Sequence, residues 1–123
     1  MIFVFGSNKL GIHGAGSALF AFRNYRAKWG VGEGITKRAY ALPTKHTPQK
    51  AMTIREIQES VFTFLSYAKH SRYDFKITQV GCGLGGWTKE DIAPLFSAQF
   101  DNCFFDTAWR DLLPPGTKFW GTF

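Results

Sequence analysis

Short apolar runs alternate with helix-like segments along this chain, and that order restricts the fold more than any other feature of the sequence. The runs that predict buried strands cover residues 2–5, 38–42, 75–80 and 103–106. A helix is expected between each pair of strands, over residues 15–28, from Thr53 and from Thr88. Strands that alternate with helices predict an α/β fold, in which a mixed and largely parallel sheet carries helices on both faces.

Two of these helices begin with a clear capping signal. Thr53 is followed three residues later by Glu56, and Thr88 is followed three residues later by Asp91. Pro43 is expected to close the second strand because proline cannot donate to a sheet ladder. The segment 112–123, LLPPGTKFWGTF, is rich in aromatic and turn residues, and we assign no element to it.

The length and composition indicate one compact domain over residues 1–123. Hydrophobic residues make up 45% of the chain, which excludes a disordered tail. No apolar stretch approaches the roughly 20 residues needed to cross a bilayer, and the start, MIFVFGSN, lacks the basic region of a signal peptide. Two cysteines and three scattered histidines suggest neither a disulfide framework nor a metal site. We therefore expect a cytoplasmic protein with no cofactor or metal and no membrane partner.

The positive charge is concentrated in the N-terminal half. Residues 1–50 contain eight Lys or Arg against one acidic residue, whereas residues 51–123 contain seven against eight. A one-sided basic field favours an anionic partner. One such partner is nucleic acid, for which the candidate contacts are Arg23, Arg26, Lys28, Lys37 and Arg38.

Two glycine-rich segments follow predicted strands. Residues 6–16 read GSNKLGIHGAG, and residues 81–87 read GCGLGGW. In parallel α/β sheets, ligands bind beyond the carboxyl ends of the strands, where such loops gather. The two loops together therefore predict one ligand site.

The second loop is compatible with three chemistries. Gly81, Gly83 and Gly86 match the G-x-G-x-x-G pattern of dinucleotide-binding proteins, although only 37 residues follow Gly86. Cys82 could be a nucleophile in an anion-binding loop, although a small buried residue is the simpler interpretation. The loop could also cradle a phosphate, with backbone N–H groups and a helix N-terminus as donors and Trp87 stacked on a sugar or base.

Three short motifs in this order resemble macrodomains, the α/β modules that bind ADP-ribose. They read Gly14-Ala15-Gly16, Leu42-Pro43-Thr44-Lys45 and Gly81-Cys82-Gly83-Leu84, and the resemblance extends over nearly the whole chain. It is strongest to the terminal ADP-ribose protein glycohydrolase branch. The resemblance implies a three-layer α/β/α fold and a minimal, N-terminally shortened member, without the strand whose aspartate reads adenine in most macrodomains.

The resemblance also assigns roles to particular residues. Lys45 corresponds to the lysine that attacks the anomeric carbon in that branch, whereas other branches use an Asn and a His or acidic group near the first loop, here Asn8 and His13. The residues expected to bind the ligand lie in both loops and beside Lys45: Ser7, Asn8, Gly14, Ala15, Gly16, Ser17, Thr44, Gly81, Cys82, Gly83, Leu84, Gly85, Gly86 and Trp87.

One position departs from the glycohydrolase pattern. Gly85 stands where that branch has a catalytic carboxylate, and the nearby Glu90 and Asp91 are better explained as helix-capping groups. The expected function is therefore binding of ADP-ribose, an ADP-ribosylated protein or a related nucleotide diphosphate. Hydrolysis of an ADP-ribosyl or phosphate bond is a further expectation, and a nucleic-acid-binding module remains the alternative.

Overall fold

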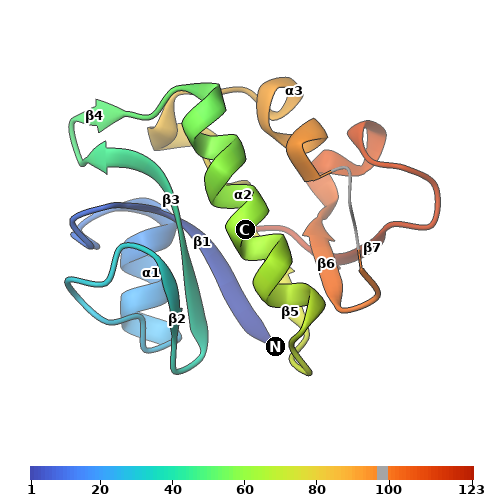
Figure 1. The fold of residues 1–123 in the computed structure, drawn as a ribbon, viewed down its shortest axis with the longest axis horizontal. Helices are drawn as coiled ribbons and strands as arrows, with labels where there is room; N and C mark the ends of the chain where they lie inside the picture. The colour runs from blue at the N-terminus through green and yellow to red at the C-terminus, as the bar shows by residue number, and fades with distance from the viewer. Residues whose placement is uncertain (97–99) are drawn as a thin grey trace.

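A seven-stranded mixed sheet forms the centre of the molecule (Figure 1). The structure is a computed structural model that describes residues 1–96 and 100–123. The strand order is β2-β3-β1-β5-β6-β7, and β4 pairs with β3. Strands β1, β3, β5, β6 and β7 run parallel, whereas β2 and β4 are antiparallel to β3. The strands are β1 (Ile2–Asn8), β2 (Gly34–Thr36), β3 (Ala39–Thr47), β4 (Lys50–Ala51), β5 (Phe75–Ile77), β6 (Cys103–Asp106) and β7 (Lys118–Gly121).

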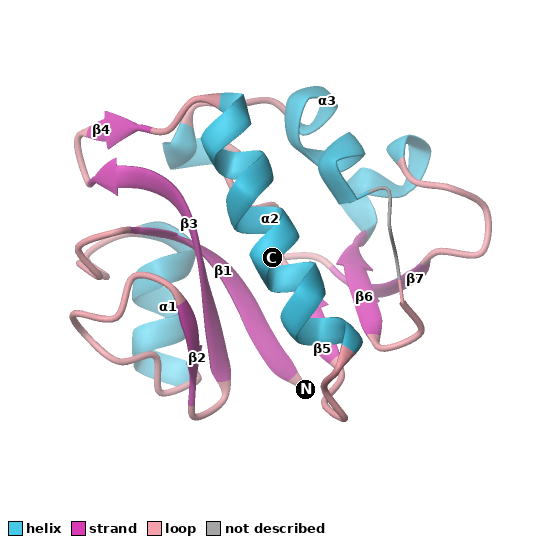
Figure 2. Ribbon diagram, viewed as in Figure 1, coloured by secondary structure: helices cyan, strands magenta, loops and turns pink. Residues whose placement is uncertain are grey.

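Helices cover both faces of this sheet, as Figure 2 shows, so the predicted three-layer α/β architecture is confirmed. Helix α1 (Gly16–Asn24) lies on one face, and α2 (Ile54–Lys69) and α3 (Lys89–Ile92) lie on the other. Three 3-10 helices complete the fold: η1 (Gly83–Gly85), η2 (Ala93–Phe96) and η3 (Thr107–Leu112).

The side chains of β1 point alternately to the two faces of the sheet and contribute to two separate hydrophobic cores. Ile2 and Val4 pack into the larger core beneath α2, whereas Phe3 and Phe5 pack beneath α1 with small residues that include Ala18. Successive side chains of a strand point to opposite faces, so one buried strand supports both helical layers.

Both predicted capping boxes are present. The Thr53 hydroxyl accepts from the Glu56 N–H, and the Glu56 carboxylate accepts from the Thr53 N–H. Thr88 and Asp91 make the same reciprocal pair. The helix after Thr88 is short, because after Ile92 it changes to the 3-10 helix η2, which contains Pro94.

The prediction that Pro43 closes its strand is wrong. Strand β3 continues through Pro43 to Thr47. Strands β2 and β4 both pair with the outer edge of β3, but neither pairs with Pro43. Strand β2 pairs only with residues 39–41, and the pairing of β4 begins at Lys45. The missing proline N–H therefore costs no ladder bond on that side.

Other boundaries also differ from the expectation. The first strand extends through Gly6, Ser7 and Asn8, which were expected in a loop, and α1 ends at Asn24 instead of residue 28. Strand β5 ends at Ile77, three residues before the expected end. The unassigned C-terminal segment contributes β7, which pairs with β6.

Candidate functional site

A cleft of about 600 Å³ lies at the carboxyl ends of β1, β3 and β5. This volume is within the range of small-molecule sites, which is about 300–1,000 Å³. Both glycine-rich loops contribute to it. The lining residues are Gly6, Ser7, Asn8, Ile12, Gly14, Ala15, Gly16, Ser17, Ala18, Thr44, Lys45, Pro48, Thr78, Gln79, Val80, Gly81, Cys82, Gly83, Leu84, Gly85 and Phe123.

The N-terminus of α1 faces this cleft without a side-chain cap. Ala15 occupies the N-cap position, makes no capping hydrogen bond, and is followed by no acidic residue in the first turn. Gly16, Ser17 and Ala18, whose N–H groups belong to that first turn, all line the cleft. The first N–H groups of a helix have no partner within it, so they remain as donors at the positive end of the helix dipole.

The second loop forms a tight turn of alternating backbone handedness. Gly81, Gly83 and Gly86 have φ of 77°, 72° and 83°, a region that favours glycine. The turn is closed by hydrogen bonds from the Gly86 N–H to the Gly83 carbonyl and from the Trp87 N–H to the Gly81 carbonyl. Backbones of this kind present successive N–H groups to one point and form anion-binding concavities.

The two loops contact each other across the cleft. A Cβ atom built on Gly16 would lie 3.0 Å from Leu84 Cδ1, and one built on Gly6 would lie 3.4 Å from the Gly81 backbone nitrogen. At Gly6, β1 therefore comes within van der Waals distance of the second loop. The donors of α1 and of the second loop thus border one space.

Thr44 and Lys45 bring the end of β3 to the same cleft. Thr44 is buried, and its Oγ1 would lie 3.9 Å from a Cβ built on Gly85. The Lys45 ammonium donates to the Pro48 carbonyl at 3.2 Å, which holds it within the turn between β3 and β4. The structure therefore places Lys45 and Gly85 in the lining of one cleft, with Thr44 nearer than Lys45 to the Gly85 Cβ position.

Cys82 lines the cleft but has the properties of an ordinary thiol. Burial, with the nearby carboxylates of Asp91 and Glu90, raises its pKa to about 11. A nucleophilic cysteine needs a depressed pKa. The interpretation of Cys82 as an activated nucleophile is therefore not supported by its surroundings.

Asn8 and Ser7 line the cleft but hold its wall through hydrogen bonds to the backbone. The Asn8 side chain donates to the Ile12 carbonyl at 2.9 Å and accepts from the Ile12 N–H at 3.1 Å. The Ser7 hydroxyl donates to the Gly32 carbonyl. These bonds fix the loop that leads to Gly14.

The structure does not bring His13 to the cleft. Its side chain is fully buried, lies edge-on to Phe5 and Trp29, and has its Nε2 2.9 Å from the Lys28 carbonyl oxygen. Burial lowers the pKa of His13, although backbone hydrogen bonds with Lys28 and Val31 oppose this shift. These contacts indicate a neutral structural imidazole, in place of the expected catalytic group.

Trp87 and Gly86 also lie outside the cleft lining. The Trp87 indole N–H donates to the Met52 carbonyl at 3.2 Å, and its ring packs against the larger core. This position does not favour the predicted stacking of Trp87 on a sugar or base.

An aromatic residue that sequence reasoning missed lies at the cleft instead. Phe123 lines it with a half-exposed ring, 4.8 Å from the ring of Phe20 in an edge-on arrangement. The buried Asp106 carboxylate holds this segment by accepting from the Phe123 N–H and the Thr122 hydroxyl. Thr78 and Gln79 also line the cleft and were not predicted from the sequence. Their polar side chains interrupt the apolar run before Gly81, which is the only local sequence signal that could have indicated them.

No protein-family model matches this sequence, and no curated protein or solved structure shows significant similarity to it. Among the helices of residues 1–96 and 100–123, none is long and apolar enough to cross a membrane.

Proposed function

We propose that this chain binds ADP-ribose or a closely related nucleotide diphosphate in the cleft between its two glycine-rich loops. The observation that carries the proposal is the uncapped N-terminus of α1, which borders the same space as the glycine turn of residues 81–86. The other two α-helices of the described residues, α2 and α3, both begin with a capping box. A diphosphate would supply the acceptors that α1 lacks.

The residues that line the site would suit a ligand with a charged centre and flat or sugar-like ends. The diphosphate would lie between the first turn of α1 and the N–H groups of Gly83 and Leu84. An aromatic base would pack on Phe123 at the mouth, and the distal ribose would lie near Lys45, Thr44 and Gly85. The resemblance to macrodomains supports the same arrangement.

Hydrolysis of an ADP-ribosyl bond is the further activity that Lys45 would serve. In that reaction the Lys45 amine attacks the anomeric carbon of the ribose, and the carboxylate that linked the sugar to a protein leaves with the bonding electron pair. Water then releases the sugar from the lysine. Gly85 provides no acid or base beside this position, so turnover by the natural sequence is expected to be slow.

A titration followed by ¹H–¹⁵N NMR tests the proposed binding mode. Addition of ADP-ribose should shift the amide signals of Gly16, Ser17, Gly83 and Leu84, whereas Phe62 on the exposed side of α2 should not move. Adenosine, which has no phosphate, is the matched ligand control and should leave these amides nearly unchanged. Shifts confined to other surfaces would contradict the proposal.

A further inference from the structure

One half of the sheet has no helix over it on the face that carries α1. Figures 1 and 2 show α1 behind the half of the sheet formed by β1, β2 and β3, and no described helix lies behind β6 and β7. The uncovered half nevertheless belongs to the same continuous sheet. Its exposed side chains therefore form a surface of the folded molecule.

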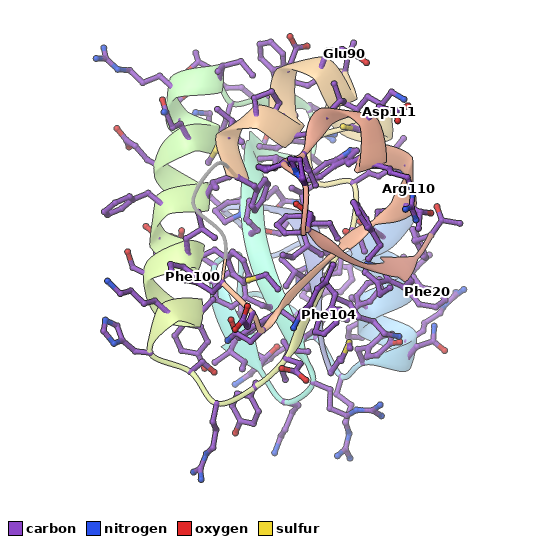
Figure 3. The ribbon with its side chains drawn as sticks, turned by 90° about the vertical axis from the view of Figure 1, so that its right-hand side faces the viewer. Phe20, Glu90, Phe100, Phe104, Arg110 and Asp111 are labelled. Carbon is purple, nitrogen blue, oxygen red and sulfur yellow. The ribbon has the colours of Figure 1, made fainter. Side chains whose placement is uncertain are left out.

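The strand register places five residues in one row across this face, and lysine alternates with phenylalanine over most of the row. Ala39, Phe3, Lys76, Phe104 and Lys118 are successive partners on β3, β1, β5, β6 and β7. The first two lie beneath α1 in the smaller core. The last three continue the row beyond the helix as a lysine, an aromatic ring and a second lysine. Figure 3 looks onto the β7 edge of the sheet and labels Phe104 beside it, with Phe20 on α1.

Cations on this face lie over aromatic rings. The Lys76 ammonium lies 5.1 Å from the Trp120 ring centroid and 5.9 Å from that of Tyr25. The Lys118 ammonium lies 5.4 Å from the Phe104 centroid, and the Arg38 guanidinium lies 5.4 Å from that of Tyr25. We define Lys76, Phe104, Lys118 and Trp120, together with Tyr25 and Arg38 at the border with the half that α1 covers, as the open sheet face.

The cations of the open sheet face form no ion pair with a described acidic residue. The ion pairs of residues 1–96 and 100–123 join Lys9 to Glu33 and His46 to Glu56, both elsewhere. Lys76 and Lys118 instead have the Tyr25 hydroxyl and the Asp101 main-chain carbonyl as hydrogen-bond partners. An anionic partner would therefore meet three cations that form no ion pair with a described carboxylate.

We propose that the open sheet face binds single-stranded nucleic acid. Proteins that bind single strands combine positive charge, which tracks the phosphates, with aromatic side chains on which bases stack. Phosphates would draw the Lys118 ammonium off the Phe104 ring and the Lys76 ammonium off the Trp120 ring, and the two uncovered rings would stack on bases. Arg38 would contact a further phosphate. A flexible single strand can follow the twisted surface of a sheet, whereas a duplex hides the faces of its bases. This surface differs from the N-terminal basic set expected from the sequence, since two of its three cations lie beyond residue 50.

Fluorescence anisotropy with a fluorescein-labelled oligothymidylate of about 12 nucleotides tests this proposal. The variant pair Lys76→Gln/Lys118→Gln should weaken binding about tenfold at low salt and reduce the slope of log affinity against log salt by about 1.4. Phe104→Leu, which retains an apolar side chain, should weaken binding at least about fivefold by removing base stacking. The control Lys50→Gln/Lys69→Gln makes the same charge change at exposed positions on β4 and α2 and should have little effect.

Several results would overturn the proposal. They are absence of binding by the natural sequence at low salt, an equal loss in the control pair, and equal affinity for duplex DNA or polyglutamate. If Lys76→Gln alters the circular dichroism spectrum, Arg38→Gln/Lys118→Gln replaces it with the same expected loss. ADP-ribose titration of the same variants should be unchanged, which separates this surface from the cleft.

Discussion

The side chain of Leu84 lies against the backbone of Gly16, where an added Cβ would come within 3.0 Å of Leu84 Cδ1. Leu84 belongs to the loop after β5, and Gly16 is the first residue of α1. Residues 68 positions apart therefore meet at the proposed phosphate site. The parallel strands β1 and β5 both end at this edge of the sheet, so the loops that follow them meet there.

Gly83→Ala should weaken ADP-ribose binding at least about tenfold, because a methyl group would narrow the N–H concavity. Gly83 has φ of 72°, so alanine also introduces backbone strain of about 1–2 kcal/mol. Gly116→Ala is the matched control, since Gly116 has φ of 88°, likewise has open space around its Cβ position, and lies outside the cleft lining. Urea unfolding should show a similar loss of stability in both variants. Equal affinity for ADP-ribose in both would contradict the phosphate assignment.

Phe123→Ala should weaken ADP-ribose binding by roughly 1–3 kcal/mol, the range for stacking of a base on an aromatic residue. Trp87→Ala should instead lower the free energy of unfolding by about 3 kcal/mol, because the ring packs against the larger core. Calorimetry and urea unfolding of both variants separate the two roles. Loss of affinity in Trp87→Ala without loss of stability would restore Trp87 as the stacking residue.

Gly85→Asp should increase the release of ADP-ribose from a glutamate-modified protein. Gly85 has no left-handed φ, and among the described residues only Thr44 Oγ1 lies within 4 Å of its Cβ position, so an aspartate fits in the cleft that Lys45 also lines. General acid–base assistance is worth about 10² to 10⁴ in rate. The assay compares the natural sequence, Gly85→Asp and Gly85→Asp/Lys45→Ala by chromatography of released ADP-ribose. Rapid release that survives Lys45→Ala would exclude the lysine as nucleophile.

Alkylation of Cys82 should be slow at neutral pH and accelerate about tenfold per pH unit up to its pKa of about 11. The raised pKa means that the folded state disfavours the thiolate. Its contribution to stability is therefore present below the unfolded thiol pKa and is lost as the pH rises through the folded value. Iodoacetamide labelling of Cys103→Ala, which leaves Cys82 as the single cysteine, measures the profile. Fast labelling at pH 7 would revive the nucleophile interpretation.

The protein should lose stability in mild acid through His13. Burial lowers the pKa of this imidazole below 6.5, so the unfolded chain binds the proton more readily than the folded one. Stability is therefore present above pH 6.5 and is lost as the pH falls through the folded pKa. Urea midpoints at pH 7.5 and pH 5.5, compared with those of His13→Gln, test this. An equal drop in both proteins would assign the effect to other groups.

Local signals in the sequence were sufficient for the parts of the fold that depend on neighbouring residues. The capping boxes at Thr53 and Thr88 join residues three apart, and both are present. Strand β3 could not be bounded in this way, because the tolerance of Pro43 depends on where β2 and β4 pair. The place of β7 likewise depends on its pairing with β6.

The residues of the candidate site likewise divide into those with a local sequence signal and those placed by contacts between distant segments. Its glycine loops could be predicted because they follow apolar strands directly. Phe123 could not, since its place at the cleft depends on hydrogen bonds to Asp106, 17 positions earlier. The burial of His13 could not be predicted either, because it is produced by Phe5, Trp29 and the Lys28 carbonyl from separate segments.

Isothermal titration calorimetry of ADP-ribose against the natural sequence and Gly14→Val tests the central claim most directly. A Cβ on Gly14 would meet no atom of the described residues within 4 Å, and Gly14 lines the cleft without a left-handed φ. Valine should therefore occupy ligand space while the unfolding free energy changes by less than about 0.5 kcal/mol. The predicted result is binding of one ADP-ribose per chain by the natural sequence and its loss in Gly14→Val. Undetectable heat with the natural sequence at about 1 mM ligand, which corresponds to about −4 kcal/mol, or unchanged affinity in Gly14→Val would contradict the claim.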